Sequence, residues 1–425
     1  MSCAYRTVAL FALLPALSSF TRASVLVVDA SGSGTYSDLP AAVAAAADGD
    51  VLLVRGGTYS GFTVVNRALD VVADAGASVR IDGVVRIEHL GLTRTFTLTG
   101  VEIVAPPHVA ALLLVSNSGS VRVQGCTLRG GVGSACSNSA DGGNALHCLH
   151  SDDVAVARST LVGGDSAEDL VTSGRGGRGL YANDSRVALH AVEARGGRAS
   201  DFSAGCPGAP GYGYGGHGGE GVVVEFGLAL FASGCELRGG DGSDFVPPAL
   251  VVSQGCGASG LVANSTSSSA LRALATTFLP GASGIGGSNC GVIPPFRTPG
   301  ATLQLFPGSA RRLNASRVTR EGQLVRMEIE GLPGDQVEIT FADRGRFGPS
   351  DPLRGVHLVA RRTPHPTLLA GTIGASGRLV VAWAVGELGA GIAARRLFAQ
   401  ATCIDSTGIP TLTNAATIVL LDAAY

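Results

Sequence analysis

The chain has 425 residues, of which 62 are glycine, 5% are aromatic and 15% are charged. This composition is typical of a turn-rich β protein rather than a helical one, and the length allows two or more domains with a large core. All 31 basic residues are arginine and the net charge is −2, which excludes lysine chemistry and gives no global attraction toward nucleic acid.

The first 23 residues have the pattern of a secretory signal peptide. Arg6 precedes an apolar run over residues 7–17, and Thr21-Arg22-Ala23 is a suitable small-residue cleavage site. The run is too short for a membrane-spanning helix, and no later uncharged run of about 20 apolar residues follows. We therefore expect residues 1–23 to be removed and the mature protein to be secreted or held at the cell surface without spanning the membrane.

Residues 25–65 predict how the fold begins. Ser37 is expected to cap a short helix, on which Leu39 and Val43 form a narrow apolar stripe. An Asp-Gly turn and the apolar run over residues 51–54, suited to a buried parallel strand, follow. An amphipathic helix followed by such strands is what the exposed end of a solenoid requires.

These residues resemble the amino-terminal segment of the pectin-lyase-like superfamily of single-stranded right-handed parallel β-helix proteins. The resemblance is close from Val25 to about Ile87 and continues later as a pattern of coils. It implies an all-β fold: a right-handed parallel β-helix over residues 24–306, closed at its amino-terminal end by a capping helix.

Five similar units support a solenoid. They end at Gly131, Gly164, Gly197, Gly240 and Gly281, so successive units are 33, 33, 43 and 41 residues apart. The variable part follows the terminal glycine each time, over residues 131–144, 164–179, 197–221, 240–260 and 281–301. We expect these five long loops to stack on one side of the solenoid.

From residue 307 the pattern changes to alternating strands separated by turns such as Pro333-Gly334 and Ser376-Gly377. We interpret residues 307–425 as a small β-sandwich, which loosely resembles carboxy-terminal modules of exported bacterial surface proteins. Trp383, the only tryptophan, is expected in its core rather than on a sugar-binding surface.

Eight cysteines remain once the leader is removed, and an even number in an exported chain favours disulfides. Eight cysteines allow 105 connectivities. The candidates are Cys136 with Cys148, and two pairs among Cys206, Cys235, Cys256 and Cys290. A zinc site would need clustered ligands such as two CxxC pairs, which the sequence lacks.

Alignment of the units predicts which side chains stack along the solenoid. One outward column reads Glu102, Thr127, Thr160, Glu193, Glu236, Thr277, and the next reads Val104, Arg129, Val162, Arg195, Arg238, Leu279. Glu193 is thus expected over Glu236, and Arg195 over Arg238. Loop carboxylates are expected beside this patch: Asp165, Asp201, Asp241 and Asp244.

A carboxylate pair flanked by guanidinium groups can cleave a glycosidic bond or recognise an acidic sugar. The candidate catalytic residues are Glu193, Glu236 and Arg238. The candidate ligand-binding residues are Arg195, Asp165, Asp241, Tyr212 and Tyr214, of which the tyrosines lie in the longest loop and suit either sugar stacking or loop packing. The alternative is a solvated ladder of charges that only keeps the solenoid soluble and in register.

Three further patterns are weaker. His217 in GGHGGEG, with Asp152-Asp153, resembles one motif of β-helix glycan hydrolases whose other elements are missing. Asp165, Asp241 and Arg238 imitate the calcium site and arginine base of the lyase branch without its signature. His147, Cys148 and His150 suit a structural strand better than a metal site. We therefore expect no metal and no cofactor.

Two functions from different classes follow. The first is a non-catalytic exported surface or matrix protein that binds polysaccharide or envelope glycan through its stacked loops. The second is a polysaccharide lyase or glycoside hydrolase that uses Glu193 and Glu236. An open groove between the two carboxylates and their surroundings would favour the enzyme, whereas salt-bridged side chains on a convex wall would count against it.

Overall fold

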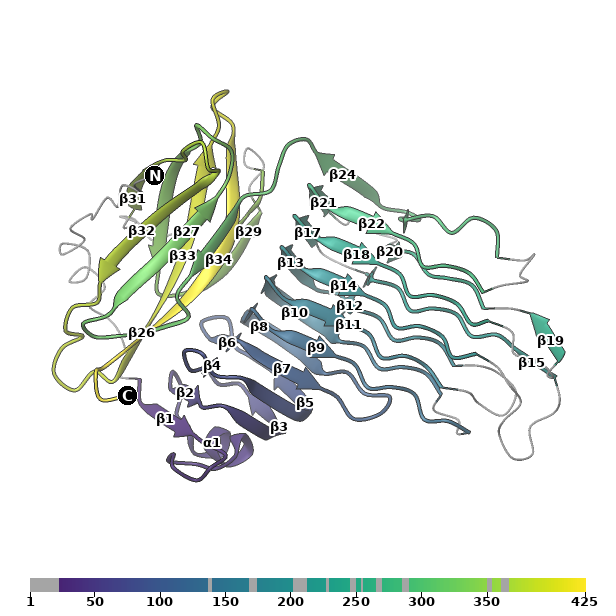
Figure 1. The fold of residues 1–425 in the computed structure, drawn as a ribbon, viewed down its shortest axis with the longest axis horizontal. Coiled ribbons are helices and arrows are strands. Elements are labelled where there is room, and N and C mark those ends of the chain that lie inside the picture. Colours follow the sequence, from purple (N-terminus) through teal and green to yellow (C-terminus); the bar gives the residue numbers. More distant parts are fainter. Residues whose placement is uncertain are drawn as a thin grey trace.

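Almost all the regular structure is β-strand. The computed structural model describes residues 23–425 apart from 137–139, 168–173, 202–211, 227–228, 245–249, 254, 265–269, 285–289, 350–353 and 361–366. The predicted signal peptide therefore lies, except for Ala23, outside the described residues. Twenty-two of the described strands form one large parallel sheet wound into a β-solenoid, and mainly antiparallel strands follow it (Figure 1).

The amino-terminal end of the solenoid is covered by helix α1 (Leu39–Ala45), on which Leu39 and Val43 are buried as predicted. The cap is Asp38 rather than Ser37: its Oδ1 accepts hydrogen bonds from the backbone N–H of Leu39 and of Ser60, both at 2.8 Å. The carboxylate thus caps the helix and joins it to a neighbouring strand, a double role that the helix pattern alone does not reveal.

Three parallel faces surround the solenoid core, and the cross-section is therefore roughly triangular. The docked face consists of β1 (Val25–Val28), β2 (Val51–Val54), β4 (Asp70–Ala73), β6 (Thr95–Thr99), the second halves of β8 (Leu112–Gln124) and β10 (Leu146–Ala157), β13 (Arg186–His190), β17 (Ala229–Ser233), β21 (Ala270–Leu274) and β24 (Thr302–Phe306).

The charged face consists of the first halves of β3 (Gly57–Val65) and β5 (Val79–Glu88), then β7 (Val101–Val104), β9 (Thr127–Arg129), β11 (Thr160–Val162), β14 (Glu193–Arg195), β18 (Glu236–Arg238) and β22 (Thr277–Leu279). The third face consists of the second halves of β3 and β5, the first halves of β8 and β10, then β12 (Leu180–Asn183), β16 (Val222–Glu225), β20 (Leu261–Asn264) and β23 (Phe296–Arg297). Between them, side chains such as Leu128, Leu161 and Leu237 fill the core with no exposed surface.

The glycine-rich loops do stack, and they form an ordered slab that we call the glycine slab. Each loop has an outgoing segment that leaves the charged face and a returning segment that leads to the third face. Backbone hydrogen bonds join outgoing and returning segments in alternation along the solenoid. The N–H of Gly177 donates to the carbonyl of Gly164, Gly197 donates to Gly177, Gly219 to Gly197 and Gly240 to Gly219, at 2.7 to 2.9 Å. The backbone of the slab is therefore paired in a regular way instead of being restrained only by disulfides.

Close backbone approach explains why glycine recurs at these positions. A Cβ added at Gly197 would lie 2.0 Å from the carbonyl oxygen of Gly164, well inside contact distance. The same close approach recurs at Gly164, Gly219 and Gly240. One position of the series carries alanine, Ala258, which accepts the hydrogen bond from Gly281. The slab projects away from the solenoid, and β15 (Tyr212–Tyr214) pairs with β19 (Leu250–Ser253) at its far end (Figure 1).

Replacing Gly197 by alanine should destabilise the protein, because the new methyl group must push two backbone layers apart. We expect the free energy of unfolding to fall by about 1–3 kcal/mol, measured by urea unfolding followed by circular dichroism. Gly374→Ala is the matched control, since a Cβ there meets no atom within 4 Å. Equal stability of the two variants would show that the slab tolerates side chains.

Two sheets follow the solenoid and pack as a sandwich; their strands pair antiparallel, except that β26 and β34 pair in parallel. One contains β25 (Arg312–Ala315), β27 (Leu324–Glu330) and β32 (Arg378–Ala384). The other contains β26 (Val318–Arg320), β34 (Pro410–Leu421), β33 (Ala394–Ile404), β28 (Gln336–Ala342) and β31 (Thr367–Thr372). A hairpin is added by β29 (Gly345–Pro349) and β30 (Val356–Val359). Trp383 is 8% exposed and packs edge-on against Phe341 in the core, as predicted.

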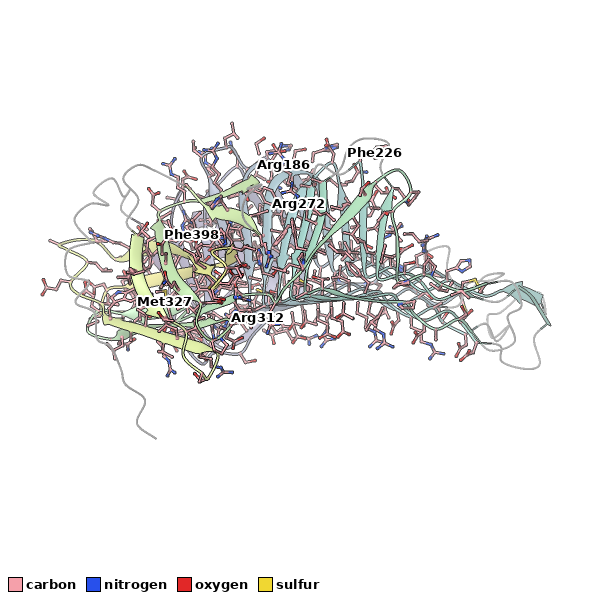
Figure 2. All side chains as sticks on the ribbon, turned by 90° about the horizontal axis from the view of Figure 1, so that it is seen from above. Arg186, Phe226, Arg272, Arg312, Met327 and Phe398 are labelled. Carbon is pink, nitrogen blue, oxygen red and sulfur yellow. A yellow bond between two sulfur atoms is a disulfide. The ribbon has the colours of Figure 1, made fainter. Side chains whose placement is uncertain are left out.

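The sandwich packs along the docked face of the solenoid (Figures 1 and 2). Ala188 and Phe231 of the solenoid share an apolar cluster with Phe398 of the sandwich. Three ion pairs reinforce this interface: Asp70 with Arg396 at 2.8 Å, Asp74 with Arg320 at 3.0 Å, and Asp153 with Arg122, whose guanidinium also donates to the carbonyl of Leu358. The sandwich is thus firmly docked on the solenoid and is not a pendant module.

The predicted disulfides are partly correct. Cys256 and Cys290 are bonded, and Cys136 is also disulfide-bonded. Pairing of Cys136 with Cys148 is wrong, because Cys148 points into the solenoid core and is free, and Cys235 is also free and buried. Cys206 lies outside the described residues. Burial raises the pKa of the Cys235 thiol to about 11, so this residue stays a protonated core side chain.

Candidate functional site

The charged face carries the two predicted columns. Strand pairing places Glu102, Thr127, Thr160, Glu193, Glu236 and Thr277 in one register column, and Val104, Arg129, Val162, Arg195, Arg238 and Leu279 in the next. The middle residue of β14 and of β18 is buried and its neighbours are exposed, so both charged columns point outward. Glu193 and Glu236 are therefore neighbours on adjacent strands, about 4.8 Å apart in the backbone.

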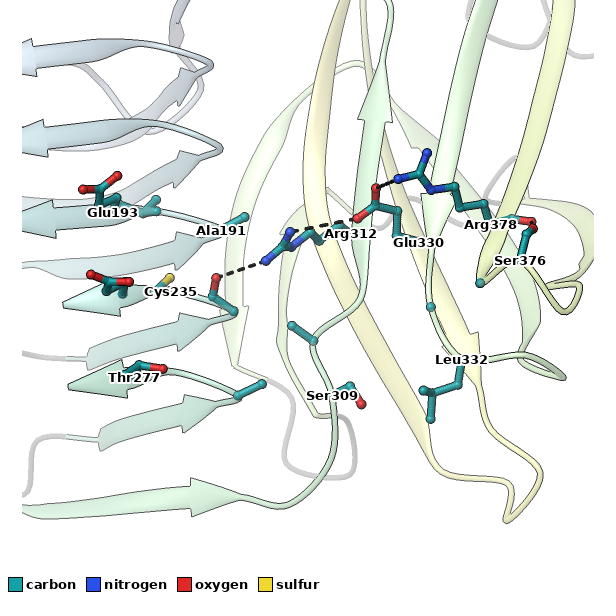
Figure 3. A pocket seen from close by; sticks show the side chains of 17 residues that line it. Ala191, Glu193, Cys235, Thr277, Ser309, Arg312, Glu330, Leu332, Ser376 and Arg378 are labelled. Atoms are coloured by element: carbon teal, nitrogen blue, oxygen red, sulfur yellow. Dashed lines mark hydrogen bonds and ion pairs between the residues drawn. The ribbon is translucent and has the colours of Figure 1, made fainter. Parts of the chain in front are cut away.

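A groove separates this face from the sandwich (Figure 3). It has a main compartment of about 740 Å³ and a smaller one of about 390 Å³, which share Ala191, Glu193, Arg312 and Glu330. The solenoid wall carries Thr160, Glu193, Glu236 and Thr277, and the groove therefore crosses four successive strands, roughly 14 Å along the solenoid. Ser309, Leu332, Ser376 and Arg378 contribute to the opposite wall.

Charges on the sandwich wall are paired with one another. Glu330 lies 4.0 Å from Arg312 and 3.6 Å from Arg378, and Arg378 also contacts Glu328 at 3.1 Å. Arg312 reaches across the groove, where it donates to the carbonyl oxygen of Gly234 at 3.4 Å (Figure 3). Arg312 therefore connects the two walls, and both of its contacts are long.

Charges on the solenoid wall are not paired. Within the described part of the chain, the side chains of Glu193 and Glu236 make neither a hydrogen bond nor an ion pair. A glutamate elsewhere in the same column is paired: Arg129 contacts Glu102 on the preceding strand at 3.0 Å. Arg238 stands in the same relation to Glu193, yet these two side chains do not meet. The groove thus contains two available carboxylates.

The predicted arginines and aspartates occupy other positions. Arg195 and Arg238 are exposed on the charged face but do not line the groove. Asp165 and Asp241 serve the glycine slab: each accepts a hydrogen bond from a backbone N–H of the next coil, at 2.7 and 2.8 Å. Asp201 and Asp244 also lie in the slab, where both contact Arg198. The structure therefore does not gather these residues around the carboxylate pair.

Tyr212 and Tyr214 belong to β15, near the far end of the glycine slab, and their side chains lie outside the described part of the structure. Asp153 cannot act in an acid pair with Asp152, because it is buried and bonded to both Arg122 and the N–H of Phe347. The Nδ1 atom of His217 accepts a hydrogen bond from the Cys256 N–H at 3.0 Å in the slab. His147 points outward, and its ring packs edge-on against Tyr181.

Sequence reasoning missed the sandwich wall of the groove. Arg312, Glu330 and Arg378 carry no motif, and their approach to the solenoid depends on which face the sandwich covers. One local signal exists: Glu330 and Arg378 alternate outward on β27 and β32, and the strand register makes them direct partners. That register predicts an ion pair on the sandwich surface but says nothing about a groove.

The described part of the chain offers neither a metal-binding cluster nor a membrane-spanning helix. No group of three or more His, Cys, Asp or Glu side chains there is arranged to hold a metal ion. No described helix has the length and hydropathy that a membrane span requires.

Comparisons with known proteins do not identify a relative. No family model matches the chain, and no curated protein matches it. A solved structure, superoxide reductase (neelaredoxin) from Ignicoccus hospitalis, aligns with 26% of this chain and 80% of its own, at 11% identity and a TM-score of 0.15. A TM-score this low indicates no shared fold, so this match supports no functional argument. The class that the structure itself defines is an all-β protein with a parallel β-solenoid.

Proposed function

We propose that the chain is an exported protein of the cell surface or extracellular matrix that binds polysaccharide or envelope glycan. The solenoid is proposed to be a right-handed parallel β-helix of the pectin-lyase-like kind over residues 24–306, and residues 307–425 its β-sandwich module. The signal-peptide pattern supports export, and the disulfide between Cys256 and Cys290 supports an oxidising compartment.

The groove between the charged face and the sandwich carries this proposal. It is long enough for several sugar units, crosses four strands, and offers hydroxyl and carboxylate groups at regular spacing. Thr160 and Thr277 lie at either end of the Glu193 and Glu236 pair in the same column. Linear polymers suit such a repetitive wall, because successive units meet successive strands. We place the ligand in this groove and not on the glycine slab.

Isothermal titration of the purified mature protein with uronate, neutral and amino-sugar oligomers tests the proposal. We expect at least one class to bind, and the double variant Glu193→Gln/Glu236→Gln to bind it tenfold or more weakly, since hydrogen bonds to charged groups contribute about 1.5–3 kcal/mol each. Arg195→Ala/Arg238→Ala should have the smaller effect, because these arginines lie outside the groove. Absence of binding for every class would refute the proposal.

A second candidate is glycoside hydrolysis, favoured by one observation: the two unpaired carboxylates are neighbours in a groove. Retaining glycosidases hold their two carboxyl groups about 5–5.5 Å apart, close to the spacing of adjacent strands. In that reaction one glutamate attacks the anomeric carbon while the other protonates the departing oxygen. Release of reducing ends by the wild type, abolished in Glu193→Gln and in Glu236→Gln, would establish the enzyme; binding without turnover would exclude it for the sugars tested.

A further inference from the structure

The two walls of the groove differ in how their charges are compensated. On the sandwich wall, Glu330 lies between two arginines and Arg378 also contacts Glu328. The sandwich wall therefore presents little uncompensated charge to a ligand.

The solenoid wall carries Arg158, which donates to Asn314 of the sandwich, and two glutamates that face the groove. The side chains of Glu193 and Glu236 are exposed and have no ion-pair or hydrogen-bond partner in the described structure. Arg238 stands in the position from which Arg129 neutralises Glu102 elsewhere on the same columns, and it does not do so here. Two carboxylates on adjacent strands repel one another, so a cation placed between them relieves that repulsion as well as gaining attraction.

The groove also lacks the usual surface for stacking neutral sugars. None of the described residues that line it is aromatic. Recognition there has to come from charge and from hydroxyl groups such as those of Thr160 and Thr277. This combination selects ligands that carry a positive charge together with many hydroxyl groups.

We propose that the groove takes glycans with free amino groups, with the ammonium group of one amino-sugar unit held between Glu193 and Glu236. The inference rests on the proposed function and names its ligand class. Hydroxyl groups of the flanking units would bond with the threonines at either end of the pair. Acetylation removes the charge, and a uronate reverses it, so both modifications weaken binding.

Matched oligomers test this directly. Hexamers of glucosamine and of N-acetylglucosamine are titrated into the full-length mature protein at about pH 6. We expect the free amine to bind at least tenfold more tightly, and the preference to weaken as salt is raised. A preference of the protein for the acetylated or a uronate oligomer would overturn the inference and leave the proposed function standing, whereas no binding of any oligomer would remove both.

Variants assign the preference to the groove. Glu193→Gln/Glu236→Gln should abolish it; both side chains are exposed and unbonded, so the fold is retained, as thermal unfolding will show. Glu102→Gln is the matched control, because it occupies the same column outside the groove and is already paired with Arg129. Persistence of the preference in the double variant, or equally tight binding of a tetralysine peptide, would contradict the assignment.

Discussion

Asp153→Asn is expected to lower the free energy of unfolding by about 3–5 kcal/mol, because it leaves the buried guanidinium of Arg122 without its counter-charge. The Arg122 side chain is 4% exposed and donates to both oxygens of Asp153, at 2.6 and 3.0 Å. The carboxylate also accepts from the Phe347 N–H of the sandwich at 2.9 Å. The change therefore weakens both the solenoid strand and the docking of the sandwich, and chemical denaturation measures the loss.

The neighbouring residue gives the control. Asp152 is half-buried with no bonded partner in the described structure, so Asp152→Asn should change stability by less than about 0.5 kcal/mol. Replacing the pair together, as Arg122→Met/Asp153→Leu, should recover stability relative to Asp153→Asn, since no buried charge is then left alone. A loss in Asp153→Asn no larger than in Asp152→Asn would contradict this account of the interface.

The columns of the charged face could be predicted because the coils of a solenoid stack on one another, so that aligning the repeat units in the sequence gives the register between strands. Once the terminal glycines of two units are aligned, every strand position follows, and Glu193 falls opposite Glu236 without any knowledge of side-chain packing. Alternation along the strand also predicts that Cys148 points inward, and it is buried there. Its predicted bond to Cys136 failed because disulfides require Cα atoms within about 7 Å, a distance that spacing along the chain does not give.

Neither the glycine slab nor the groove could be predicted from the sequence, for two different reasons. The repetition of Gly164, Gly197 and Gly240 is visible in the sequence. Its cause is close backbone contact between the outgoing and returning segments of the loops, and that contact is seen only in the folded structure. The groove depends on which solenoid face the sandwich covers. That choice is made by apolar residues such as Ala188 and Phe231, which read as ordinary strand residues until the docked structure is known.

The same interface predicts a strong dependence of stability on acid. His190 is 2% exposed in the docked face, its ring lies 5.4 Å from that of Phe231, and neither ring nitrogen has a hydrogen-bond partner among the described residues. Burial lowers the pKa of His190 to about 3 in the folded protein, against about 6.5 in the unfolded chain. Between these values the unfolded chain binds a proton that the folded protein does not.

Stability is therefore unaffected by His190 above about pH 6.5 and should fall by about 1.4 kcal/mol for each pH unit below it, until the folded pKa is reached. Urea unfolding of the wild type and of His190→Phe between pH 7 and about pH 4.5 measures this slope as a difference, so carboxylates common to both proteins cancel. His150→Gln is the control, because that histidine is exposed and pairs only with Asp184. Parallel stability curves for the wild type and His190→Phe would mean that the buried ring is hydrated or partnered, and the docked interface would then have to contain a polar group that compensates it.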